Sequence, residues 1–271
     1  MWWDERMAEL ACMVEEGPVL VWDGETLNDL VFDLLSLDCV DGVPFDTALS
    51  AHPRLLGALG RLGAGFLCRS GEEIDRVLHY ALADPASCVL LAGGTDPGKA
   101  WAGLPPGVMV AVPVGDALDP GGLRGREVLV IPASAPEDAS RIQDRLRDLA
   151  RVQARVRGFY LPRVEEGRET APPPGEWPLI AGRDGILVPG GGTGLVLDRG
   201  TAAPDLAGTA ERLEAWKAML PEGELRVEPG AGFFAAAAAL AAREGEEVRV
   251  RAPAPLGPRR GSGPEVQFLP A

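Results

Sequence analysis

The fold is decided by residues 43–73, which read VPFDTALSAHPRLLGALGRLGAGFLCRSGEE. Two short strand-like runs, at residues 43–47 and 65–68, are each followed by a stretch with apolar residues at helical spacing. Ser70, followed three residues later by Glu73, predicts a capping box at the start of the second helix. The order strand, helix, strand, helix is typical of a parallel sheet.

The same alternation continues on both sides of this stretch. Further strands are predicted at residues 19–22, 88–92, 108–112, 127–131, 156–161, 185–188 and 224–227. Further helices are predicted at residues 4–15, 26–36, 137–155, 206–220 and 233–243. Roughly eight strand-and-helix units favour an α/β protein with a (β/α)8 TIM-type barrel over an open sheet.

Prolines mark the parts of the chain that do not fit this pattern. Residues 163–178 are rich in charge and proline and are predicted to form a loop. We expect a barrel over residues 1–250 and a proline-rich tail over residues 251–271 that adds an edge strand near residues 266–269.

The composition limits the classes of partner. Acidic residues outnumber basic ones by 40 to 26, giving a net charge of −14, which argues against nucleic acid and anionic membranes as partners. No run of about 18 apolar residues predicts a membrane span, and no basic segment with an apolar core follows Met1. We therefore expect a cytoplasmic protein. Its four cysteines lack metal-binding spacing and are expected to be free thiols, buried at Cys68 and Cys88.

Several segments resemble diaminopimelate decarboxylases. Residues 17–27, GPVLVWDGETL, are similar to the family's opening "TPLYVYDLDTL". Residues 48–73 are similar, without a gap, to "KANPHPAIL…GFGFECVSIGEL". The leading Trp2 and Trp3 and residues 124–128 most resemble the decarboxylase half of fused aspartate kinase–decarboxylase enzymes.

Two later motifs extend the resemblance over most of residues 1–245. Residues 190–194 resemble the family's glycine loop, and residues 228–230 resemble its "EPGR" motif. The resemblance implies a fold-type III pyridoxal-phosphate (PLP) barrel, like the N-terminal barrel of alanine racemase and the decarboxylases.

In this family a lysine at the end of the first barrel strand forms a Schiff base with PLP, which requires an amine. The ungapped alignment places Ala48 at that position, so no covalent cofactor is expected there. The chain has two lysines, Lys99 and Lys217. Lys99 follows a predicted strand and remains a candidate substitute, whereas Lys217 is interpreted as a solvated charge on a helix.

The resemblance also implies a phosphate site, at which PLP or another phosphate ligand binds without a covalent bond. Glycine loops and helix N-termini present backbone N–H groups to anions. Glu228 matches the glutamate that faces the pyridine nitrogen, and Ala231 replaces the arginine of the family motif. The alternative is that these segments are only tight turns of a barrel. The candidate cofactor-binding residues are Gly190, Gly191, Gly192, Thr193, Gly194, Glu228, Gly230 and Ala231.

Other family features are missing. The "HxHxGS" strand corresponds to residues 158–163, which contain no histidine. The C-terminal β-domain of the family is predicted to be missing as well. We therefore predict a non-catalytic barrel, a partner of an aspartate kinase or a decarboxylase in lysine and aspartate-family metabolism. Two alternatives stay open: an enzyme of altered chemistry, acting through Lys99 or without cofactor, and a small-molecule binder that uses the glycine loop.

Overall fold

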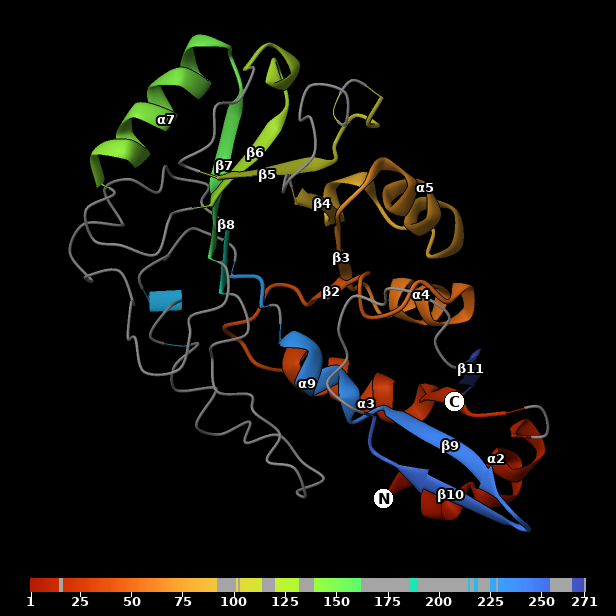
Figure 1. Ribbon diagram of the computed structural model, residues 1–271. Coiled ribbons are helices and arrows are strands. Elements are labelled where there is room, and N and C mark those ends of the chain that lie inside the picture. The colour runs from red at the N-terminus through yellow and green to blue at the C-terminus, as the bar shows by residue number, and fades with distance from the viewer. Residues whose placement is uncertain are drawn as a thin grey trace.

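The computed structural model contains two β-sheets that share one hydrophobic core (Figure 1). It describes residues 1–14, 17–91, 101, 103–113, 120–131, 139–161, 186–189, 214, 217–218, 225–227, 229–253 and 265–270. The larger sheet carries the strands predicted between residues 43 and 188, and the smaller sheet joins the two ends of the chain. The strand predicted at residues 19–22 belongs to the smaller sheet and not to the barrel strands.

The larger sheet has seven strands in sequential order, and every neighbouring pair is parallel. This confirms the predicted α/β class. The strands are β2 (Pro44–Asp46), β3 (Gly65–Cys68), β4 (Cys88–Leu91), β5 (Met109–Pro113), β6 (Glu127–Ile131), β7 (Arg155–Leu161) and β8 (Ile186–Pro189).

Helices α4 (Pro53–Arg61), α5 (Gly71–Tyr80) and α7 (Ala139–Arg151) lie on the outer side of this sheet (Figure 1). Two short 3-10 helices, η1 (Pro85–Ser87) and η2 (Pro120–Leu123), precede β4 and β6. Outward-facing strand residues such as Phe66, Val110 and Val128 pack in the same core cluster as Leu55 and Ile74 of the helices.

Residues 225–227 lie beside the start of β2, where a strand is predicted at residues 224–227. Gly42 forms a parallel bridge with Arg226, and the Val227 N–H donates to the Gly42 carbonyl at 2.8 Å. The Asp41 N–H donates to the Leu225 carbonyl at 2.8 Å. Within the described ranges no pairing joins β8 to this segment, so the closed barrel remains a prediction.

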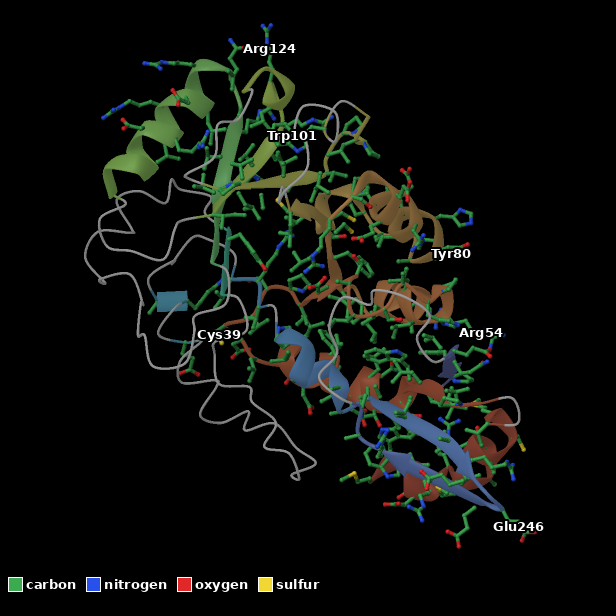
Figure 2. The ribbon with its side chains drawn as sticks, in the orientation of Figure 1. Cys39, Arg54, Tyr80, Trp101, Arg124 and Glu246 are labelled. Carbon is green, nitrogen blue, oxygen red and sulfur yellow. The ribbon has the colours of Figure 1, made fainter. Side chains whose placement is uncertain are left out.

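The smaller sheet has the order β10-β9-β1-β11. Its strands are β1 (Val19–Asp23), β9 (Ala238–Glu244), β10 (Glu247–Arg251) and β11 (Glu265–Leu269). β1 is antiparallel to β9 and parallel to β11, which confirms the edge strand predicted near residues 266–269. Glu246 marks the turn between β9 and β10 (Figure 2).

The helix predicted over residues 233–243 is wrong. Helix α9 spans only Gly230–Ala235, and the chain then enters β9. Alanine-rich sequence favours helix, but this preference is weak and yields to tertiary contacts. Here β9 pairs with β1 on one side and with β10 on the other, and Ala239 and Ala241 are fully buried.

Three helices complete the N-terminal part: α1 (Trp2–Glu5), α2 (Met7–Met13) and α3 (Gly24–Leu35). The predicted helix at residues 4–15 is thus split at Arg6. On one side of the small sheet, Leu10 of α2 packs with Val19 and Val21. On the other side, Leu20 and Trp22 belong to the main core.

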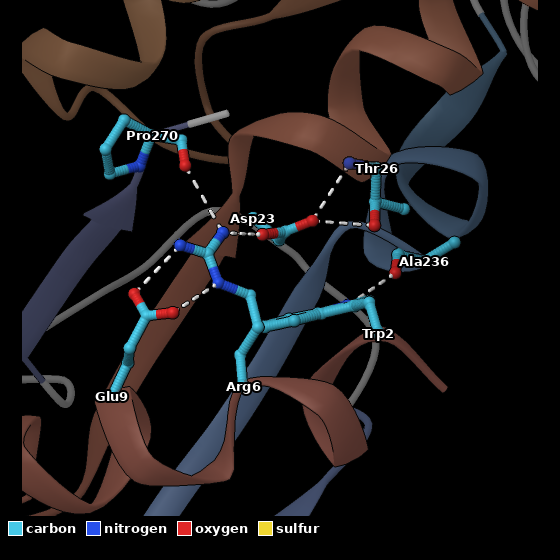
Figure 3. Close-up of polar contacts among 7 residues, drawn as sticks. All are labelled: Trp2, Arg6, Glu9, Asp23, Thr26, Ala236 and Pro270. Atoms are coloured by element: carbon cyan, nitrogen blue, oxygen red, sulfur yellow. Dashed lines mark hydrogen bonds and ion pairs between the residues drawn. The ribbon is translucent and has the colours of Figure 1, made fainter.

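A polar cluster at the end of β1 ties the two ends of the chain together (Figure 3). The Arg6 guanidinium donates to Asp23 Oδ1 at 2.6 Å and to the Pro270 carbonyl at 3.2 Å. Asp23 Oδ2 accepts from the N–H and hydroxyl of Thr26 at 2.9 and 2.7 Å, which caps α3. We call Arg6, Asp23, Thr26 and Pro270 the terminal clasp.

Gly60 allows α4 and α5 to approach closely. A Cβ at this position would overlap the Ala81 carbonyl oxygen and lie 2.9 Å from the Ala81 Cβ. Gly60→Ala is therefore expected to lower the free energy of unfolding by about 1–3 kcal/mol, as for other overpacked contacts. Urea unfolding monitored by circular dichroism measures this.

The matched control is Gly71→Ala at the first residue of α5, where an added Cβ meets nothing within 4 Å. This variant should be neutral or more stable, because alanine favours helix over glycine. Equal stability losses in the two variants would show that the contact with Ala81 is not the cause.

Candidate functional site

The inner face of the larger sheet is apolar. Side chains alternate along a strand, so every second residue faces the same side. One buried cluster gathers the inward residues of five neighbouring strands, with Leu91 and Ile131 packed against it: Leu67, Val89, Met109, Ala111, Leu129 and Tyr160. Active and binding sites of parallel barrels lie at the carboxyl ends of the strands.

Cys68 and Cys88 lie on the opposite, helix-facing side and are buried, as expected from the sequence. Burial raises the pKa of Cys88 to about 11 and that of Cys68 still further. Both thiols are therefore neutral core groups. In the part of the chain that the structure describes, no group of three or more His, Cys, Asp and Glu side chains could hold a metal ion.

Ala48 lies in the turn directly after β2, at the carboxyl end of the sheet. It is half-buried, and its N–H donates to Asp46 Oδ1 at 2.9 Å. The only side-chain atom at this position is a methyl carbon.

Asp46, at the end of β2, and Arg69, which follows β3, form a bidentate ion pair. Arg69 Nη2 donates to Asp46 Oδ2 at 2.7 Å, and Nη1 donates to Oδ1. The hydrogen bond to Asp46 raises the pKa of Arg69, and the charges of Asp46 and Glu73 and the nearby Tyr160 add to this. The guanidinium is thus permanently charged and fixed in direction.

Glu73 connects this ion pair to the start of α5. The Glu73 N–H donates to Ser70 Oγ at 3.2 Å, which confirms Ser70 as the N-cap. The reciprocal half of the predicted capping box is wrong, because the Glu73 carboxylate binds Arg69 and Thr47 instead of the Ser70 N–H. Glu73 Oε2 accepts from the Arg69 N–H at 2.7 Å and lies 2.7 Å from Thr47 Oγ1. The carboxylate therefore holds the backbone of Arg69 against the end of β2.

A β-bulge in β7 directs Tyr160 inward. Val128 pairs with Val156 but Leu129 pairs with Gly158, so Arg157 is an extra residue. Regular pairing would place residue 160 on the helix-facing side, because alternation would continue unbroken. With the bulge, Tyr160 joins the inner cluster and is 7% exposed.

Sequence reasoning missed Asp46, Arg69 and Tyr160 as site residues. A signal for Arg69 was available, because the family stretch has valine before the serine that corresponds to Ser70. Asp46 could have been noticed as a charged residue at an inward position of a barrel strand. Tyr160 could not, because the bulge is not visible in the sequence.

Several candidate residues cannot be compared with the structure. Gly190, Gly191, Gly192, Thr193, Gly194, Glu228 and Lys99 lie outside the described residues. Gly230 and Ala231 begin α9, and their surroundings are not described.

Lys217 is helical, as predicted, and its side chain is 27% exposed. It also forms an ion pair that the sequence did not predict, with its Nζ 2.5 Å from Asp41 Oδ2. The same carboxylate oxygen accepts the Leu225 N–H at 2.6 Å. Lys217 therefore takes part in the junction between Asp41 and the segment beside β2.

No protein-family model matches the chain, and neither does any curated protein. Among solved structures, the lysine decarboxylase of Selenomonas ruminantium matches with a TM-score of 0.65 and 22% identity, over 89% of this chain and 70% of that one. The ornithine decarboxylase of Entamoeba histolytica matches with a TM-score of 0.61 and 16% identity, over 91% and 76%.

A viral arginine decarboxylase, from Paramecium bursaria Chlorella virus, has a TM-score of 0.65 and 16% identity, over 89% of this chain and 71% of that one. The fold is that of the PLP-dependent decarboxylases. A further similar structure is that of SrLDC in complex with PLP and cadaverine. At these identities the likeness establishes the decarboxylase fold alone.

The described residues do not fit a covalently held PLP at position 48. A Schiff base needs a primary amine, and Ala48 has none. The neighbouring cation, Arg69, carries a guanidinium that stays protonated in proteins. No chemical step through a covalent cofactor is therefore derived for this decarboxylase fold.

Proposed function

We propose that the chain is a degenerate diaminopimelate decarboxylase-like barrel that acts as a non-catalytic partner or regulatory subunit in lysine and aspartate-family metabolism. The observation that carries the proposal is the end of β2. The resemblance places Ala48 at the position of the family's lysine, and the adjacent inward position is Asp46, which Arg69 binds.

The chemistry supports this reading. PLP serves decarboxylases as an electron sink once it is bound. An amine at the end of the strand would be needed to hold it covalently and release it in turn. Neither a methyl group nor a guanidinium clamped by a carboxylate can do this. A barrel core survives such losses because packing does not depend on the catalytic groups.

A further element belongs to the proposal. A phosphate cradle made by residues 190–194, Glu228, Gly230 and Ala231 would hold PLP or another phosphate ester without a covalent bond.

The proposal is tested by assaying release of carbon dioxide from diaminopimelate, lysine, ornithine and arginine in the presence of PLP. No turnover above the rate without protein is expected, because no primary amine stands at position 48. Turnover would contradict the proposal, and its loss in Lys99→Ala would assign the activity to an enzyme of altered chemistry that uses Lys99.

The partner role has a separate test. The purified chain is mixed with an aspartate kinase and, separately, with a diaminopimelate decarboxylase, and complex mass is measured by light scattering after size exclusion. A defined complex with one of them and a change in its rate are expected. Absence of both effects with both enzymes would remove this part of the proposal.

A further inference from the structure

The carboxyl end of the larger sheet combines an apolar inner face with three polar side chains, Asp46, Arg69 and Tyr160. The inner face is formed by the cluster around Leu67, with Leu91 and Ile131 partly buried at its edge. Ligand sites typically join an apolar lining to a few convergent polar groups. These three side chains are not those expected to hold PLP.

Exposure distinguishes the roles of the ion-paired groups. The Arg69 side chain is 43% exposed, whereas that of Asp46 is 15% exposed. Asp46 Oδ1 also accepts the Ala48 N–H, so the carboxylate is committed to groups of the protein. The group that remains accessible is the guanidinium, a donor and not an acceptor.

Among the described residues, Asp46 alone accepts hydrogen bonds from the Arg69 guanidinium and fixes its direction. The guanidinium has five N–H donors, of which one on each terminal nitrogen points to Asp46. The other three donors have no acceptor among the described residues. A planar group with N–H donors in fixed positions is suited to bind a carboxylate.

Tyr160 supports a ligand site at this end independently. Its inward direction depends on the bulge at Arg157, and bulges are common next to active sites, where they redirect a side chain. Tyr160 packs in the same inner cluster as Leu67, which pairs with Asp46 in the sheet. The phenol therefore lies on the same face of the sheet as Asp46, which binds Arg69.

The charges select the class of ligand. Arg69, Asp46 and Glu73 together carry a net charge of −1, which disfavours a dianion such as a phosphate monoester more than a monoanion. We propose that Arg69, oriented by Asp46 and accompanied by Tyr160, binds the carboxylate of a small apolar monocarboxylic acid without a covalent bond. This site is separate from the phosphate cradle and does not depend on the proposed partner role.

The test is a calorimetric and thermal-shift titration of the full chain with 4-methylpentanoate, its neutral amide, and 3-methylbutylamine. Saturable binding is expected for the carboxylate alone. Arg69→Gln should weaken it by about tenfold or more, because charge-assisted hydrogen bonds are lost. Tyr160→Phe should weaken it by a smaller factor.

Two further variants keep the test decisive. Arg69→Lys preserves a charge for Asp46, so it should fold, but its ammonium cannot offer the planar fork, and weaker binding is again expected. Arg124→Gln is the matched control. Arg124 is an exposed arginine that precedes β6, at the opposite end of the strand from the site (Figure 2), and its replacement should leave binding unchanged.

Three results would overturn the inference. The first is that 4-methylpentanoate shows no saturable binding to the full chain. The second is equal binding of the amide or the amine, which would indicate hydrophobic contact or a cation site at Asp46. The third is carboxylate affinity that is unchanged in both Arg69 variants.

Discussion

Asp23→Ala is expected to lower the free energy of unfolding by about 3–5 kcal/mol, the range found when one partner of a buried ion pair is removed. The Asp23 side chain is 2% exposed, and that of Arg6 is 19% exposed. Removing the carboxylate also leaves the N–H of Thr26 without its cap. Urea unfolding followed by tryptophan fluorescence gives the difference directly.

The effect should reach both ends of the chain, because the terminal clasp joins α2, β1 and the end of β11 (Figure 3). Hydrogen exchange should therefore accelerate most in β11 and α2. The hydrogen bond to Glu9 is the main cause that raises the pKa of Arg6, with Asp23 adding to it. The guanidinium stays charged in the variant and loses its buried counter-ion.

Glu9→Ala is the matched control. It removes the other carboxylate bound to Arg6, but the Glu9 side chain is 51% exposed, and exposed ion pairs contribute little. Its stability should be nearly that of the unchanged chain. Asp23→Asn should fall between the two, because asparagine still caps a helix. A loss in Glu9→Ala as large as in Asp23→Ala would contradict the role assigned to burial.

Restoring a lysine at position 48 is expected not to restore the cofactor bond by itself. In Ala48→Lys, the new ammonium would lie beside Asp46, whose carboxylate favours the protonated, non-nucleophilic amine. Arg69 would still extend across the end of β2. The triple variant Asp46→Ala, Arg69→Val, Ala48→Lys removes both obstacles.

Borohydride reduction after incubation with PLP, followed by peptide mass analysis, measures the covalent adduct. The triple variant should carry at least about tenfold more adduct on the introduced lysine than Ala48→Lys alone, which corresponds to one pKa unit. Equal adduct in both would show that the ion pair is no obstacle. Absence of adduct in both would count against the proposed phosphate cradle.

The barrel strands could be predicted from the sequence because their pattern is local. Buried parallel strands such as β4 and β6 are apolar runs followed by turn or helix signals, and the cap at Ser70 is a four-residue motif. The same local reasoning failed at residues 238–244. There an alanine-rich segment is a strand because β1 lies beside it, more than two hundred residues earlier in the chain.

The candidate site was only half predictable for the same reason. The resemblance to the decarboxylase motif was enough to place Ala48 at the position of a lysine. The ion pair of Asp46 and Arg69 joins residues 23 positions apart, and their meeting depends on the register of β2 against β3. Tyr160 depends on a bulge that changes which side of the strand faces inward.

The most direct test of the central claim is the same reduction experiment on the unaltered protein. PLP is titrated while absorbance is followed, and the sample is then reduced with borohydride and analysed by peptide mass. No covalent adduct is expected on either lysine, Lys99 or Lys217, whether or not PLP stabilises the fold. A stoichiometric adduct on Lys99 would contradict the central claim and establish a covalent cofactor site elsewhere in the barrel.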